Sequence, residues 1–144
     1  MARFRTERGT ALIETALTLP LVLLLSVSIF EFGRAYQTWQ VLTNAAREGA
    51  RVSILPGATT SNVQARVTSY MQSGQLSNYG TASVVVNRSA TLSYGSGTAS
   101  ASIVTVNYPF QFIVLQPVAR LLVPGSSLGA PFTMTASAEM RNEQ

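Results

Sequence analysis

The chain has 144 residues and a formal net charge of +4, which arises from ten arginines and six glutamates because Lys, Asp, His and Cys are all missing. Nucleophilic triads, zinc sites and calcium loops each depend on residue types from this missing set. The composition therefore argues against an enzyme, and we expect neither a cofactor nor a bound metal. Most arginines are scattered singly, so no basic stripe for nucleic acid is expected either.

An apolar run follows a start that contains Arg3, Arg5 and Arg8. Residues 11–30 carry one charged side chain, Glu14, and their length matches the about 20 residues that a membrane-spanning helix needs. The leading arginines predict that the N-terminus stays in the cytoplasm and that the rest of the chain is exported.

Three interpretations of this run are open. A secretory signal peptide would be cleaved near Ser26-Val27-Ser28, where small residues make a tolerable site. A plain signal anchor would stay uncleaved and hold a binding module at the cell envelope. A type IV prepilin signal would be cut after Gly9 on the cytoplasmic side, so that residues 1–9 form a leader and Thr10 becomes the first mature residue.

Glu14 favours the prepilin interpretation. A carboxylate within a membrane span is costly and usually marks pairing or function. After a cut at Gly9, the new α-amino group of Thr10 and the side chain of Glu14 lie on one helical face, about one turn apart. This amino group can pair with Glu14, or with Glu14 of a neighbouring copy during assembly. The alternative is a carboxylate at the headgroup level that reaches water.

The predicted helix does not end at the membrane. Residues 10–33 form the transmembrane part, and Pro20 in its middle predicts a kink because proline removes one helical hydrogen bond. From residue 34 to 55, apolar residues recur every three to four positions, which indicates an amphipathic continuation that Pro56-Gly57 ends.

The continuation carries a surface of small residues. Such a surface lets another helix approach closely, and it suits packing against this protein's own sheet equally well. Its members are Ala45, Ala46, Gly49 and Ala50.

The sequence pattern of residues 56–144 predicts an α/β head domain. A short helix capped by Asn62 ends near Gly74, and strand candidates follow at 82–90, 100–115 and 131–141, with a turn at 93–97. The last candidate alternates cleanly, which places Phe132, Met134, Ala136, Ala138 and Met140 on one face. The predicted fold class is α+β: a long N-terminal transmembrane and amphipathic helix, then a small antiparallel sheet with one short helix, like a type IV pilin.

A loop rich in Pro and Gly separates the last two strand candidates. It contains four apolar residues, Val118, Leu121, Leu122 and Leu128. They form either a helical turn that covers the sheet or an exposed patch for a partner, and we expect the cover because clustered leucines usually find a surface to bury against.

The N-terminal segment resembles the TadE-like family, small prepilin-type proteins of the tight-adherence (Flp, type IVb) pilus machinery. The resemblance rests on Gly9, Glu14, Leu19-Pro20, the Glu-Phe-Gly-Arg stretch at 31–34 and the Asn-Ala-Ala-Arg-Glu-Gly-Ala-Arg stretch at 44–51, with a less specific similarity at 135–141. The sequence departs from the pattern at Thr15, where Flp-type signals often have an aromatic residue.

The resemblance implies a minor pilin or pseudopilin. Such a protein is cut by a prepilin peptidase and takes part in pilus assembly, adherence and biofilm formation. Its implied partners are that peptidase, other pilins and minor pilins, pilus assembly proteins and the lipid of the bacterial inner membrane. An uncleaved, membrane-anchored envelope binding module is the alternative, and a DNA-uptake pilin is disfavoured because the head lacks a basic stripe.

Overall fold

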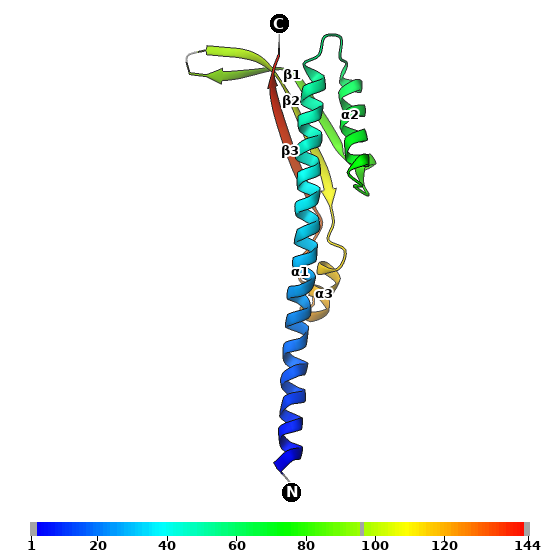
Figure 1. Cartoon of the computed structure of the whole chain (residues 1–144), viewed down its shortest axis with the longest axis vertical. Coiled ribbons are helices and arrows are strands. Elements are labelled where there is room, and N and C mark those ends of the chain that lie inside the picture. Colours follow the sequence, from blue (N-terminus) through cyan, green and yellow to red (C-terminus); the bar gives the residue numbers. More distant parts are fainter. Residues whose placement is uncertain (1–2, 96, 143–144) are drawn as a thin grey trace. The chain divides into compact units, whose positions relative to one another are not determined.

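The computed structural model describes residues 3–95 and 97–142, and it confirms the predicted α+β class (Figure 1). Met1 and Ala2 of the predicted leader lie outside this range. The elements in chain order are α1 (Arg3–Ser53), α2 (Thr60–Ser73), the 3-10 helix η1 (Tyr79–Thr81), β1 (Ser83–Tyr94), β2 (Gly97–Phe110), α3 (Leu115–Leu122) and β3 (Phe132–Arg141).

The chain divides into two compact units. The stalk unit contains residues 1–34 and 111–130, and the head unit contains residues 35–110 and 131–144. Helix α1 contributes its N-terminal part to the first unit and its C-terminal part to the second.

Helix α1 runs through Pro20 without interruption, and the kink predicted there stays a prediction. The helix ends at Ser53 rather than near Leu55. The Ser53 hydroxyl donates a 2.7 Å hydrogen bond to the carbonyl of Ala50, and the chain turns before Pro56 and Gly57. Gly57 has a φ of 75°, a left-handed conformation that glycine adopts without steric cost.

Small residues of α1 lie at the centre of the head unit. The four residues singled out in the sequence are all buried: Ala45, Ala46, Gly49 and Ala50. A Cβ added at Gly49 would lie 2.5 Å from Cγ2 of Val67 in α2 and 3.1 Å from Cγ1 of Val104 in β2. The missing side chain therefore lets α2 and the sheet both approach α1 closely.

Helix α2 begins one turn earlier than predicted. Its N-cap is Thr59 rather than Asn62, because the Thr59 hydroxyl accepts a 3.2 Å hydrogen bond from the backbone N–H of Asn62. Buried Val63, Val67 and Met71 form one face of the helix, at the spacing of three to four residues expected for an α-helix.

A charged group connects α1 with α2. Glu48 accepts hydrogen bonds from Arg51, three residues later in the same helix, and also from Arg66, with a shortest distance of 2.7 Å. The hydrogen bonds from Arg51 and then Arg66 lower the pKa of the Glu48 carboxyl to about 2. Both arginines are more than half exposed, so the group adds roughly 1 kcal/mol or less to stability.

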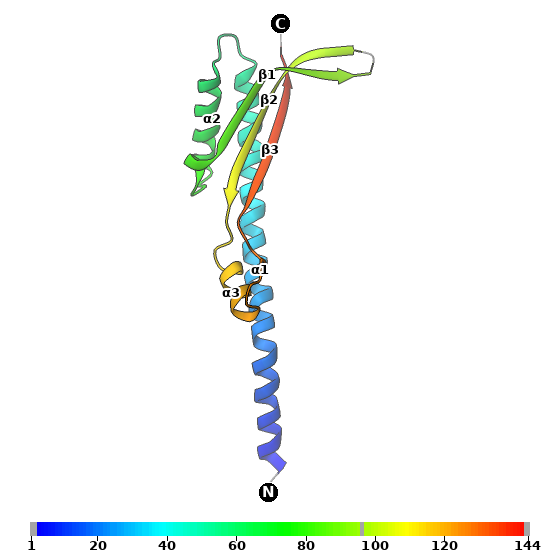
Figure 2. The same cartoon turned by 180° about the vertical axis from the view of Figure 1, so that it is seen from behind.

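The sheet is an antiparallel meander with strand order β1-β2-β3 (Figure 2). On one face Val104, Val106, Tyr108, Phe110, Met134 and Ala136 are buried. The opposite face carries polar pairs such as Thr105 with Ser137, whose hydroxyl oxygens are 3.1 Å apart. This alternation confirms the one-sided burial that the last strand predicted.

Two strand bounds differ from the prediction. β1 continues to Tyr94 instead of stopping near residue 90, because it pairs with β2 up to Gly97 beyond an irregularity at Asn87–Ala90. The sequence predicted that the second strand reaches residue 115, but β2 ends at Phe110. Its pairing with β3 ends there too, where Phe110 lies opposite Phe132. The β-forming residues that follow lead into α3. The first turn of α3 contains Pro117, and proline is tolerated there because its missing N–H would have no helical partner.

The apolar loop belongs to the stalk unit. Residues 111–130 group with the N-terminal part of α1, which is not the sheet cover that the sequence favoured. Leu115 and Ala119 are buried, whereas Leu121 and Leu128 are exposed. The physical reason is an acceptor on α1, described below, that holds the start of α3.

Gly49→Ala tests the close approach in the head unit. The added methyl group should cost 1–3 kcal/mol through overpacking, which exceeds the gain of up to about 1 kcal/mol in helix propensity. We therefore expect the melting temperature, followed by circular dichroism in detergent, to fall by about 5 °C. Gly33→Ala is the matched control, since nothing lies within 4 Å of a Cβ there. Equal melting temperatures for the two variants would contradict the packing argument.

Candidate functional site

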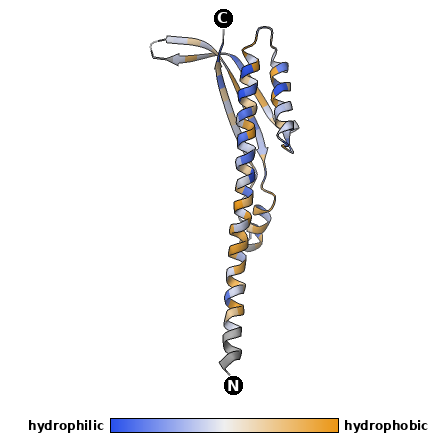
Figure 3. Cartoon of the chain, viewed as in Figure 1, coloured by the Kyte–Doolittle hydropathy of each residue, from blue (hydrophilic) through white to orange (hydrophobic). Residues whose placement is uncertain are grey.

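Most of the N-terminal part of α1 is apolar (Figure 3), and its large apolar side chains are exposed. Leu17 is 75 % exposed and Phe30 is 79 % exposed. The described part of the helix is long and apolar enough to cross a membrane, and none of its most apolar window is buried. Exposed apolar surface of this extent marks contact with lipid or with other apolar helices.

The predicted processing site lies on this helix. Gly9 is part of α1, and nothing lies within 4 Å of a Cβ built on it. Thr10 and Glu14 are exposed, and the helical conformation places them on one face, one turn apart. The backbone carbonyl of Glu14 accepts a 2.9 Å hydrogen bond from the Thr18 hydroxyl.

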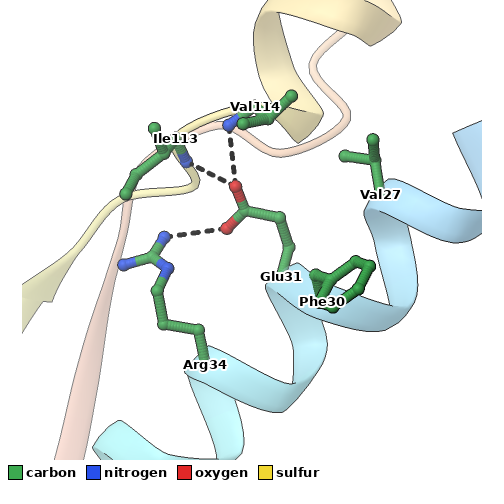
Figure 4. Close-up of a pocket in the computed structure, with 6 residues that line it drawn as sticks. All are labelled: Val27, Phe30, Glu31, Arg34, Ile113 and Val114. Carbon is green, nitrogen blue, oxygen red and sulfur yellow. Dashed lines mark hydrogen bonds and ion pairs between the residues drawn. The ribbon is translucent and has the colours of Figure 1, made fainter.

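A second carboxylate, Glu31, lies at the end of the apolar run and is only 5 % exposed (Figure 4). One of its oxygens accepts hydrogen bonds from the backbone N–H groups of Ile113, at 2.9 Å, and Val114, at 2.7 Å. The other oxygen accepts from Arg34 at 2.8 Å. Arg34 also donates to the backbone carbonyl of Gln111.

Glu31 accepts hydrogen bonds from the backbone N–H groups that precede α3. Val114 is the N-cap of this helix, and its backbone N–H lies before the helical hydrogen bonds, so without Glu31 it would need water. A negative charge at this position also complements the positive end of a helix. Glu31 and Arg34 together therefore hold the segment from Gln111 to Val114 against α1 by its backbone.

Aromatic and small residues complete this contact of Glu31 and Arg34 with residues 111–114, which we call the anchor. The rings of Phe32 and Phe112 meet edge to face with centroids 6.0 Å apart. Gly129, with a φ of 75°, passes so close to the first turn of α3 that a Cβ would lie 2.8 Å from the Gln116 nitrogen. A hollow of about 330 Å³ remains beside the carboxylate, lined by Val27, Phe30, Glu31, Arg34, Ile113 and Val114 (Figure 4).

The geometry of the anchor fits a structural role, in which it holds two segments of the chain together. Among the residues that the structure describes, no group of three or more His, Cys, Asp or Glu side chains gathers to hold a metal ion. The Glu31 oxygens are occupied by three donors, so they serve in positioning the chain.

Sequence reasoning found Glu31 and Arg34 only as part of a motif and gave them no role. A usable signal was present, because a carboxylate that closes an apolar run needs partners and Arg34 follows at a spacing of three. The partners Ile113 and Val114 could not be identified, since they bond through backbone atoms from a distant part of the sequence.

Glu31→Ala should release the segment that contains α3. Loss of the acceptor leaves two backbone N–H groups without a partner and should cost about 2 kcal/mol locally, so hydrogen exchange over residues 113–122 should accelerate roughly 30-fold. Exchange in β2 should be unchanged. Glu139→Ala, which removes an exposed carboxylate of β3, is the control. Unaltered exchange at Ile113 and Val114 in the Glu31 variant would contradict the anchor.

Comparison with known proteins bears on the same helix. The family model described as TadE-like protein matches residues 9–51, all of which lie in α1. No curated protein and no solved structure matches the chain. TadE-like proteins are Tad pilus-associated, minor-pilin-like structural proteins, and the long apolar helix fits a membrane-anchored protein of this kind. The resemblance predicted from the sequence is thus confirmed: residues 9–51 of the chain match the TadE-like family model.

Proposed function

We propose that this protein is a minor pilin or pseudopilin that takes part in assembling a type IVb (Flp/Tad) pilus and in surface adherence and biofilm formation. The main support for this proposal is the exposed apolar helix, which has an exposed carboxylate, Glu14, one turn after Thr10. The match to the TadE-like family over residues 9–51 supports the same proposal.

Processing begins at Gly9, in this proposal, where a prepilin peptidase cuts the leader on the cytoplasmic side. A peptidase needs locally opened backbone, and a glycine within a helix weakens it by up to about 1 kcal/mol relative to alanine. No neighbouring side chain packs on Gly9 to oppose this opening. The cut creates a charged α-amino group on Thr10, at the end of the helix where Glu14 is also found.

The helix then serves in two environments. It stores the subunit in the inner membrane, and it later exchanges lipid for the helices of other pilins, which are about as apolar. Pairing between Glu14 and an α-amino group would fix the axial position of neighbouring helices, because an unpaired carboxylate among apolar side chains is costly. The head unit contacts other pilins, minor pilins and assembly proteins on the exported side.

Gly9→Ala should block processing. We expect the wild-type protein, expressed with the prepilin peptidase, to begin at Thr10 by intact mass and N-terminal sequencing, and the variant to keep its leader. Gly33→Ala is the matched control: it is another α1 glycine with nothing within 4 Å of a Cβ, and it should be cut normally. An uncut wild-type chain would favour the anchored envelope binding module, and a new end near Ile29 would indicate a secretory signal peptide.

Glu14→Gln should separate processing from assembly. The variant keeps the size of the side chain, so the cut after Gly9 should proceed, but the lost charge should reduce co-purification with partner pilins at least tenfold. Glu139→Gln removes an exposed charge of β3 and should have no effect on either readout. A Glu14 variant that is cut and assembles like the wild type would rule out the pairing.

A further inference from the structure

The segment 111–130 runs alongside the apolar part of α1. Its start is held by Glu31, the residue that directly follows the apolar run, and both Figure 1 and Figure 2 show α3 next to α1. Leu24 and Val27 are half-buried although most of the run is exposed. Since residues 111–130 are the only other part of the stalk unit, they provide this cover. From Glu31 back to Leu24 the helix rises about 10 Å.

Most of the large side chains exposed on this segment are apolar. Leu115 and Ala119 are buried on one side of α3, whereas Leu121 is 83 % exposed on another. Ile113, Val123 and Leu128 are exposed as well. Arg120 is the single charged residue between positions 111 and 130, and it is exposed. A solvent-facing loop would not be expected to show this composition.

Several backbone N–H groups of the segment have hydrogen-bond partners within the protein. Glu31 accepts from the N–H groups of Ile113 and Val114, which precede α3. After α3, the N–H of Val123 donates to Ala119, that of Ser126 to Val123 and that of Ala130 to Ser127, while that of Leu128 donates to the Ser126 hydroxyl. Irregular backbone is tolerated at membrane depth only where its polar groups are satisfied in this way.

We propose that residues 111–130 are a second membrane-binding element, in which α3 lies in the lipid leaflet on the exported side, next to the transmembrane helix. The inference rests on the membrane anchoring in the proposed function. Its expected depth of about 10 Å below Glu31 matches the 5–10 Å to which interfacial amphipathic helices insert. The long side chain of Arg120 reaches toward the lipid phosphates, as basic residues do at this level.

Lipid fits this surface better than a protein partner does. The exposed Ile113 and Val114 line one hollow together with the exposed Phe30 of α1, so the two apolar surfaces adjoin and one solvent covers both. The hollow between them is a shallow gap beside Glu31. A bilayer adapts to such an outline, whereas a protein partner needs a complementary groove.

Single-cysteine variants test the proposal directly, because the natural chain contains no cysteine. The full-length protein is reconstituted in vesicles of phosphatidylethanolamine and phosphatidylglycerol, with bimane attached at Leu121→Cys, Leu17→Cys or Thr133→Cys. Leu17 reports on the transmembrane helix, and Thr133, exposed on β3, reports on the head. Quenching by nitroxide-labelled lipids and the rate of reaction with a water-soluble maleimide are measured for each.

We expect lipid nitroxides to quench Leu121→Cys at least twofold more strongly than Thr133→Cys, and the maleimide to react with it at least tenfold more slowly. Val123→Cys should behave like Leu121→Cys. Because both positions are exposed, these replacements leave the buried side of the segment intact.

Three results would overturn the inference. If Leu17→Cys is quenched while Leu121→Cys is unquenched and reacts rapidly, α3 is in water although the anchor stands. If Leu121→Cys is protected from the maleimide but unquenched, the surface contacts protein instead of lipid. If Leu17→Cys is also unquenched, the membrane anchoring itself fails, which the cut after Gly9 tests independently.

Discussion

The apolar surface that α1 leaves uncovered between Leu12 and Phe30 is the constraint on which the rest of the stalk unit depends. About 25 cal/mol for each Å² of such surface opposes its exposure to water, so the helix requires lipid or other helices around it. In that surrounding, water no longer satisfies polar groups, and each charge needs a partner. The carboxylate within this stretch of α1 and the one that directly follows it meet this requirement differently. Glu31 is satisfied within its own chain, whereas in our proposal Glu14 acquires its partner through a peptide-bond cleavage.

The same helix faces a different problem in the head unit. There it must pack against α2 and the sheet at once, and bulky side chains would hold these elements apart. Ala45, Ala46, Gly49 and Ala50 solve this by their small size, so that Val63, Val67 and Val104 occupy the space beside Gly49. One helix therefore changes from large apolar residues that face outward to small ones that face inward. The family match extends over both types of surface, from Gly9 to Arg51.

The parts of the fold that follow from local periodicity could be predicted from the sequence. The span of α1, the buried face of α2 and the alternation in β3 all follow from short-range spacing. The largest error occurs where a distant partner decides. Residues 111–115 have the composition of a strand, but they leave the sheet because Glu31 binds their backbone and β3 pairing stops at Phe110. Thr59 replaces Asn62 as a cap because both residue types suit the role and only the geometry selects one. Motif similarity drew attention to Gly9, Glu14 and the 31–34 stretch, but it gave no role to Glu31.

The bond from Glu31 to Ile113 and Val114 also sets an order of events during synthesis. These partners are separated by 82 and 83 positions in sequence, so the ribosome completes α1 long before the acceptor meets its backbone donors. Until these donors arrive, while the helix enters the membrane, the Glu31 carboxylate can pair with Arg34, which lies three residues away. Closing a loop of this length carries a large entropic cost, which folding of the intervening chain lowers by bringing its ends together. We therefore expect residues 113 and 114 to dock on Glu31 only after the intervening head has folded.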